Sequence, residues 1–265
     1  MRRLALLLVV LPLAACGGSK SSAPPSNLTP VAYVKSAALK TAQVPSEHAT
    51  LTASVAAAGQ AVALSGAGDF NNTHRIGSMH LDFSVAGLSS TLDEVLSGTT
   101  IYLQSPLFSA SLPSGKTWLK LDLQKALATK GIDFSALLSQ NPAETLSQLQ
   151  SSGAVTKVGG ETIDGVDTTH YRGTIDPSKL SQDAGAKIAA LANAKYGPYD
   201  VWIGNDDGYV HRMALSYSLK VKGAQREAIT MTMGFSNYGK DVTVHIPSDS
   251  VSFDGTNKAI LGLGG

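Results

Sequence analysis

The side chains that could bind a metal or transfer protons are scattered along the sequence. The chain has 265 residues, among them six histidines and one cysteine. His80 and Asp82 are two residues apart, as are Asn72 and His74, so each pair would share one face of a strand. A zinc site would need a third ligand, which the sequence does not identify. We therefore interpret these histidines as residues of an exposed face and predict no metal and no cofactor.

Two other polar groups also favour structural explanations. His170 and His211 lie within strand patterns, and we predict surface or edge positions for both. The segment 205–208, Asn-Asp-Asp-Gly, offers oxygens to a calcium ion but lacks the spaced carboxylate of an EF-hand and has the composition of a tight turn. The sequence contains no serine-hydrolase elbow, zinc-protease helix motif or phosphate-binding loop, so we predict that the protein is not an enzyme.

The single cysteine is the residue with the clearest chemical context. Residues 1–15 contain two arginines followed by an apolar run from Leu4 to Leu13, too short to span a hydrocarbon core of about 30 Å. The segment 13–16, Leu-Ala-Ala-Cys, resembles the bacterial lipobox. The resemblance implies that the signal peptide is cleaved before Cys16 and that the thiol of Cys16 is diacylated. The alternative is an ordinary cleaved signal with an accidental cysteine. We predict lipidation of Cys16 and an anchor on the extracytoplasmic face of the cell membrane.

The composition excludes several classes of partner and of fold. Lys and Arg number 21 against 20 Asp and Glu, and no long basic run is present, so nucleic acid is not an expected partner. One cysteine rules out a disulfide framework. Residues 16–30 are rich in Gly, Ser and Pro, which predicts a lipidated tether before a single folded domain over 31–265.

The elements that would position these residues are mostly strands. Apolar and polar residues alternate over 50–55, 62–67, 79–85, 101–104, 117–123, 154–176, 199–221 and 226–239, with hairpin turns at Asp164-Gly165 and Asp207-Gly208. Helical spacing or capping signals appear over 31–42, 123–138, 141–153 and 177–195. Consecutive hairpins with few helices predict an α+β fold in which about ten strands form one strongly curved antiparallel sheet, with the helices against its apolar face.

A large sheet covered by few helices would leave an apolar concavity. We predict that the following residues line it: Leu64, Met79, Leu81, Phe83, Leu103, Leu119, Leu121, Ile203, Met213, Leu215, Ile229, Met231, Met233 and Phe235. Small residues at Ala53, Gly66 and Gly68 would leave room there. The alternative is that these side chains simply form a packed core.

Several stretches in order resemble an actinobacterial lipoprotein family that includes LppX, LprA, LprF and LprG and is related in fold to the carrier LolA. The resemblance rests on the lipobox and on segments 117–123, 163–180, 200–217 and 237–247. It implies an unclosed half-barrel around a hydrophobic cavity that binds, and could transport, lipids or acylated glycolipids across the envelope. The expected partners are therefore membrane lipids, as anchor and as ligand. A different hypothesis is an envelope interaction or sensor lipoprotein with a packed core and no lipid ligand.

Overall fold

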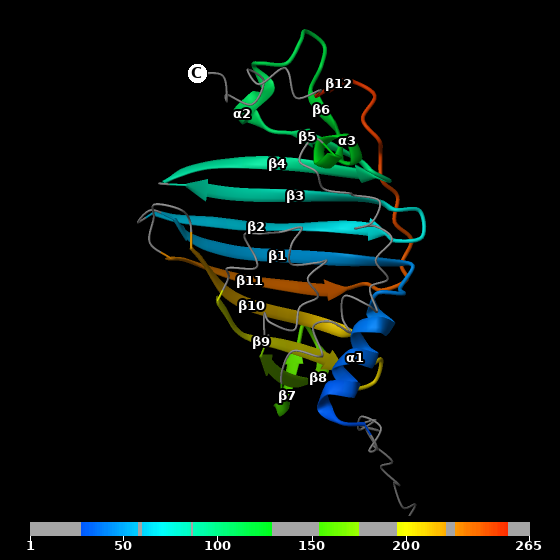
Figure 1. Ribbon diagram of the computed structural model, residues 1–265. Helices are drawn as coiled ribbons and strands as arrows, with labels where there is room; N and C mark the ends of the chain where they lie inside the picture. Colours follow the sequence, from blue (N-terminus) through cyan, green and yellow to red (C-terminus); the bar gives the residue numbers. More distant parts are fainter. Residues whose placement is uncertain are drawn as a thin grey trace, which may run out of the picture.

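The computed structural model describes residues 28–57, 60–85, 87–128, 154–174, 195–220 and 226–253. Within them, one twelve-stranded sheet has the order β12-β6-β5-β4-β3-β2-β1-β11-β10-β9-β8-β7 (Figure 1). All neighbouring strands are antiparallel except β12 and β6. The order has two free ends, so the sheet is unclosed, as predicted.

The strands follow the chain in hairpins, with one long-range pairing in the middle. Their bounds are β1 Ser46–Ala57, β2 Gln60–Asn71, β3 Ile76–Val85, β4 Leu88–Ser97, β5 Thr100–Gln104, β6 Trp118–Asp122, β7 Val155–Ile163, β8 Val166–Thr174, β9 Lys195–Gly204, β10 Val210–Lys220, β11 Arg226–Ser236 and β12 Ser250–Ser252. β1 pairs with β11, which joins the two halves of the chain. The predicted strands are confirmed, whereas β4 and β12 were not predicted.

Three helices are described. α1 (Pro30–Thr41) begins where the Thr29 hydroxyl accepts a hydrogen bond from the Ala32 N–H and Pro30 occupies the first turn, and it confirms the helix predicted over 31–42. α2 (Pro106–Ser109) is capped by Ser105, and α3 (Leu123–Ala128) is the start of the helix predicted over 123–138. The predicted helices 141–153 and 177–195 lie outside the described residues, except that Lys195 begins β9.

Both predicted hairpin turns are confirmed by their backbone. Asp164 and Gly165 have φ values of 49° and 83°, the left-handed pair that a two-residue turn between β7 and β8 requires. Between β9 and β10, the Gly208 N–H donates to the Gly204 carbonyl at 2.9 Å, and Gly208 has a φ of 66°. The carboxylate of Asp207 accepts from the Tyr209 N–H at 3.0 Å and pairs with His211 Nε2 at 2.8 Å. The segment 205–208 thus builds a turn, as predicted.

Two packed clusters lie at opposite ends of the sheet. At one end α1 packs against β7 to β10, in a cluster formed by Tyr33, Val34, Ala37, Val155, Tyr171, Val201, Ile203 and Val210. At the other end Phe108 and Leu119 are buried among Leu92, Leu103, Leu112, Leu121, Val251 and Phe253. The central strands β11, β1, β2 and β3 lie between the two clusters.

Candidate functional site

The strand register places every residue of the predicted cavity lining on one face of the sheet. Directly paired residues of neighbouring strands project to the same side. From β10 to β2, residues on this side are paired as Met213 with Met233, Leu51 with Met233 and Leu51 with Gly66. From β2 to β6, the pairs on the same side include Gly66 with Leu81, Leu81 with Leu92 and Leu103 with Leu119. We call this side the apolar face.

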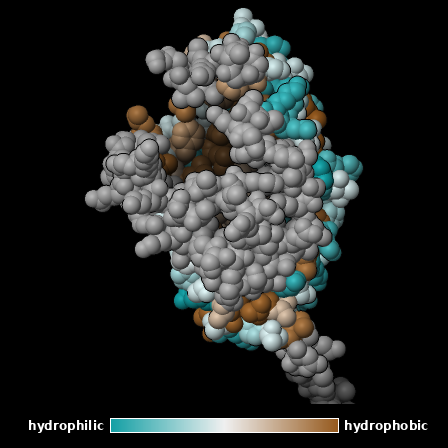
Figure 2. All heavy atoms as spheres, in the orientation of Figure 1, coloured by the Kyte–Doolittle hydropathy of each residue, from teal (hydrophilic) through white to brown (hydrophobic). Residues whose placement is uncertain are grey.

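The apolar face is packed at its ends and only half-buried in its middle. Leu119 and Ile203, both 0% exposed, belong to the two packed clusters, and Leu103, Leu121 and Phe235 pack against those clusters. Leu81 is buried. The remaining predicted lining residues are half-buried: Leu64, Met79, Phe83, Met213, Leu215, Ile229, Met231 and Met233. Figure 2 shows hydrophobic atoms at the floor of a hollow on the side of the molecule that carries α1.

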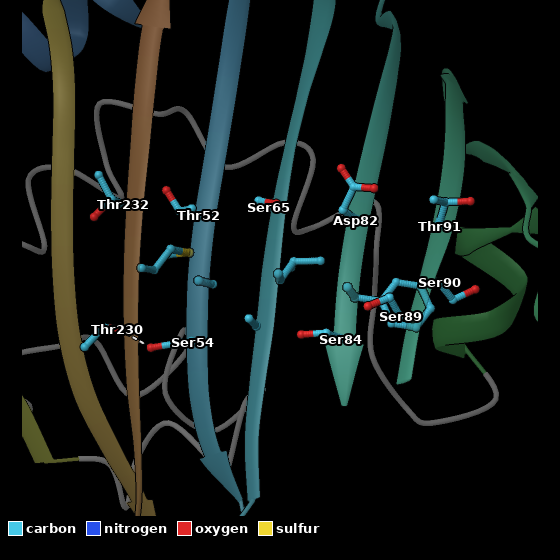
Figure 3. A pocket seen from close by; sticks show the side chains of 15 residues that line it. Thr52, Ser54, Ser65, Asp82, Ser84, Ser89, Ser90, Thr91, Thr230 and Thr232 are labelled. Atoms are coloured by element: carbon cyan, nitrogen blue, oxygen red, sulfur yellow. Dashed lines mark hydrogen bonds between the residues drawn. The ribbon is translucent and has the colours of Figure 1, made fainter. Parts of the chain in front are cut away.

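A groove of about 690 Å³ lies across the middle strands, on the face of the sheet opposite to the apolar face. Three consecutive residues from each of five strands line it: 52–54, 63–65, 82–84, 89–91 and 230–232 (Figure 3). The two outer residues of each triplet project to this opposite face, and the middle residues, among them Leu64, Phe83 and Met231, project to the apolar face. Most of the outer residues carry hydroxyls, and Ser54 and Thr230 share a hydrogen bond of 2.7 Å. This groove is therefore polar and distinct from the hollow of the apolar face.

Two carboxylates interrupt the apolar face, and the sequence patterns did not indicate either. Glu94 pairs with Met79 on one side and Leu103 on the other, and burial raises the pKa of its carboxyl. Glu47 pairs with Phe70; burial raises its pKa and a hydrogen bond with Asn72 partly offsets the rise. Glu94 lies on β4, the strand that the alternation did not predict. A negative charge on this face is therefore disfavoured.

Replacement of Glu94 should show this cost as a pH-dependent gain in stability. The pKa of Glu94 is higher in the folded chain than its unfolded value of about 4.3, so the charged carboxylate destabilises the fold. The unsubstituted chain therefore loses stability as the pH rises from the unfolded pKa through the folded pKa. Glu94→Gln, which stays neutral, should therefore have a higher urea midpoint than the unsubstituted chain at pH 7. The two midpoints should converge below about pH 4. A variant that is less stable at pH 7 would mean that the charge has a favourable partner.

The histidines divide into exposed and buried groups. His80 Nδ1 lies 2.6 Å from Asp93 and its Nε2 lies 3.7 Å from Asp82, and these hydrogen bonds and charges raise the pKa of the exposed His80. His80 and Asp82 thus share a strand face, as predicted. Asn72 and His74 do not share one, because both lie in the β2–β3 turn. Within the described residues, no group of three His, Cys, Asp or Glu side chains is arranged to hold a metal ion.

The prediction that His170 and His211 are surface or edge residues was wrong for His211, which is buried, whereas His170 is half-buried. His211 is 6% exposed, between the Asp207 carboxylate and the edge of the Tyr238 ring. His170 stacks on Trp202 with ring centroids 4.4 Å apart and bonds Asp200 at 2.6 Å. Burial raises the pKa of Asp200, but hydrogen bonds with Arg172 and His170 outweigh it and lower the pKa overall. The partners come from neighbouring strands and cover both imidazole rings.

An open sheet that is packed at both ends and hollow in the middle of its apolar face defines the class of unclosed antiparallel half-barrels to which LolA belongs. The family model described as LppX_LprAFG lipoprotein matches residues 31–244. The chain belongs to this family, which confirms the resemblance found in the sequence.

Two solved structures share the fold. Lipoprotein LppX of Mycobacterium tuberculosis is 17% identical, with a TM-score of 0.52 over 82% of this chain and 98% of that chain. LprF of Mycobacterium bovis is also 17% identical, with a TM-score of 0.50 over 82% of this chain and 96% of that chain. At this identity the likeness concerns the fold.

One curated relative is similar in sequence. It is an uncharacterized 31.2 kDa protein from the rplA–rplJ intergenic region of Streptomyces griseus, 28% identical over 173 residues. The match covers 59% of this chain and 53% of the relative, so the chain spans about half of its length. Among the described residues, no helix is long and apolar enough to cross a membrane.

Proposed function

We propose that this protein is a membrane-anchored lipoprotein that binds lipids or acylated glycolipids on its apolar face and carries them across the envelope. One observation supports it most: the middle of the apolar face is half-buried, on the side where Figure 2 shows a hydrophobic hollow, while both ends of the same face are packed. Burial of an acyl chain there would contribute about 25 cal/mol for each Å² of apolar surface removed from water. Binding by shape and apolar contact needs no catalytic group.

The anchor in this proposal is Cys16, which lies outside the described residues. Two acyl chains on the cysteine, with about 0.8 kcal/mol for each buried CH₂, would hold the chain on the membrane durably. The segment 17–30 would then act as a tether that lets the domain move between the bilayer and a partner in the envelope.

Extraction of bound lipid tests the proposal. The unsubstituted chain should fractionate with membranes, and a Cys16→Ser chain should not. Organic extracts of the purified Cys16→Ser chain should contain acyl lipid by mass spectrometry. Adding Leu64→Arg, which places a charge on the apolar face, should lower the bound lipid at least about tenfold. The matched control is Thr50→Arg, an exposed residue on the other face of the neighbouring strand, which should retain the lipid.

Two results would reject lipid binding. One is an extract of the Cys16→Ser chain without lipid, together with no exchange of added fluorescent phospholipid. The other is equal loss of lipid in the Leu64→Arg and Thr50→Arg variants, because the apolar face would then have no particular role. Circular dichroism of both variants checks that the sheet is intact.

A further inference from the structure

Glu94 lies on the apolar face inside a ring of apolar side chains. Its neighbours on that face are the residues two positions away on β4 and the directly or diagonally paired residues of β3 and β5. Those with large side chains are Leu92, Leu96, Met79, Leu81, Ile101 and Leu103. A carboxyl group in these surroundings loses much of its hydration, which is why burial raises the pKa of Glu94.

The carboxyl of Glu94 faces open space and has no protein partner. Within the part of the chain that the structure describes, neither a hydrogen bond nor an ion pair reaches it. Every fully buried side-chain nitrogen or oxygen in that part does have a partner, so the unpartnered oxygens of the half-buried Glu94 are not sealed in. They can therefore accept hydrogen bonds from a molecule that lies on the apolar face.

The half of the apolar face that carries Glu94 has no positive charge. From β1 to β6, the strand residues of this face are uncharged except Glu47 and Glu94. Glu47 lies three strands away, and its carboxyl bonds to Asn72. A ligand that placed a negative group beside Glu94 would meet a repulsion that no lysine or arginine of these strands offsets.

We propose that Glu94 selects the polar group of the lipid that binds on the apolar face. Its carboxylate accepts hydrogen bonds from a group that carries donors and no net negative charge, either an ammonium or sugar hydroxyls, and it disfavours an anionic headgroup. Hydrogen bonds to a charged acceptor are roughly twice as strong as those between neutral groups. This selection rests on the proposed function, because it requires a lipid whose acyl chains lie against the apolar ring.

A role in selection also gives the charge an effect opposite to its effect on stability. The carboxylate is expected to destabilise the ligand-free fold, as described above for Glu94→Gln. A lipid that donates to the carboxylate restores the hydrogen bonds that burial removed. Glutamine keeps the size and one acceptor oxygen but loses the charge. The Glu94→Gln chain should therefore be more stable and less selective, whereas a purely structural residue would change stability alone.

Competition between lipids measures the selection. The purified Cys16→Ser chain is loaded with fluorescent phosphatidylcholine at pH 7. The label is then displaced by phosphatidylethanolamine, by galactosyl diacylglycerol or by phosphatidylglycerol, all with the same acyl chains. At least one of the first two should bind about tenfold more tightly than phosphatidylglycerol, and the tighter of them identifies the donor as an ammonium or as sugar hydroxyls. Adding Glu94→Gln should reduce this preference to within about twofold.

The matched control is Asp93→Asn, which removes a charge from the next residue of β4, on the other face, where Asp93 pairs with His80. It should leave the preference unchanged. The selection is overturned if all three lipids bind equally, if the preference survives Glu94→Gln, or if Asp93→Asn reduces it as much. A ratio of affinities on one preparation does not depend on the folded fraction. No loading with any lipid would reject the proposed function, and the selection with it; loading without preference would reject the selection alone.

Discussion

Gly66→Val is expected to destabilise the fold by at least about 3 kcal/mol, because the backbone of β3 comes too close to β2 at this point. A Cβ on Gly66 would lie 2.6 Å from Leu81 Cδ2 and would also meet the His80 carbonyl oxygen. Gly68 repeats the problem one pair further along, where a Cβ would lie 2.8 Å from Met79 Cα. Backbone cannot move aside as a flexible side chain can, so the β2–β3 pair would have to open.

Urea unfolding of Gly66→Val beside Ala67→Val measures the effect. Ala67 is the next residue on β2, exposed on the other face, and valine there should change the free energy of unfolding by less than about 0.5 kcal/mol. Equal and small effects at both positions would show that the strands can separate at no cost. The close approach would then not be a constraint on the fold.

The role of these glycines could be predicted only in part from the sequence. Gly66 and Gly68 fall on the apolar side of an alternating pattern, which predicts the correct face. Their expected contribution was space for a ligand, whereas the structure shows a close approach of the two backbones. The separation of two strands depends on how the whole sheet curves, and a local pattern contains no information about that.

The faces of the sheet are the most predictable feature, because alternation is a property of neighbouring residues. Met213, Met231 and Met233 project to the same side as Leu64 and Phe83, although they belong to the other half of the chain. The pairing of β1 with β11 that brings them together could not be predicted, since no turn signal links strands so far apart in sequence.

Strand β4 was missed because its apolar residues fall on both faces. Leu92 and Leu96 lie on the apolar face, but Val95 between them is only 7% exposed and projects to the other side, beside its partner Tyr102. The alternation of apolar and polar residues is therefore broken along β4, and the sequence could not predict that Glu94 lies on the apolar face. The contacts of His170 were missed for a related reason, because its partners Asp200 and Trp202 lie on another strand.

Ile203→Ala and Met231→Ala should differ strongly in their effect on stability, although both remove an aliphatic side chain from the apolar face. Ile203 is 0% exposed in the cluster that joins α1 to the sheet, so its truncation should cost about 2–5 kcal/mol. Met231 is half-buried in the middle of the apolar face, so few of its contacts are lost, and its truncation should cost about 1 kcal/mol. Thermal and urea unfolding of both variants give the two values.

The difference between the two values separates the two explanations of the apolar face. A side chain in a packed core leaves a hole when it is truncated, while one that borders an existing cavity only enlarges it. A small cost at Met231, together with a changed affinity for lipid, is what a ligand cavity predicts. If instead Met231→Ala costs as much as Ile203→Ala, the central strands are packed as tightly as the end that carries α1, no space remains for an acyl chain, and the proposal of lipid binding fails.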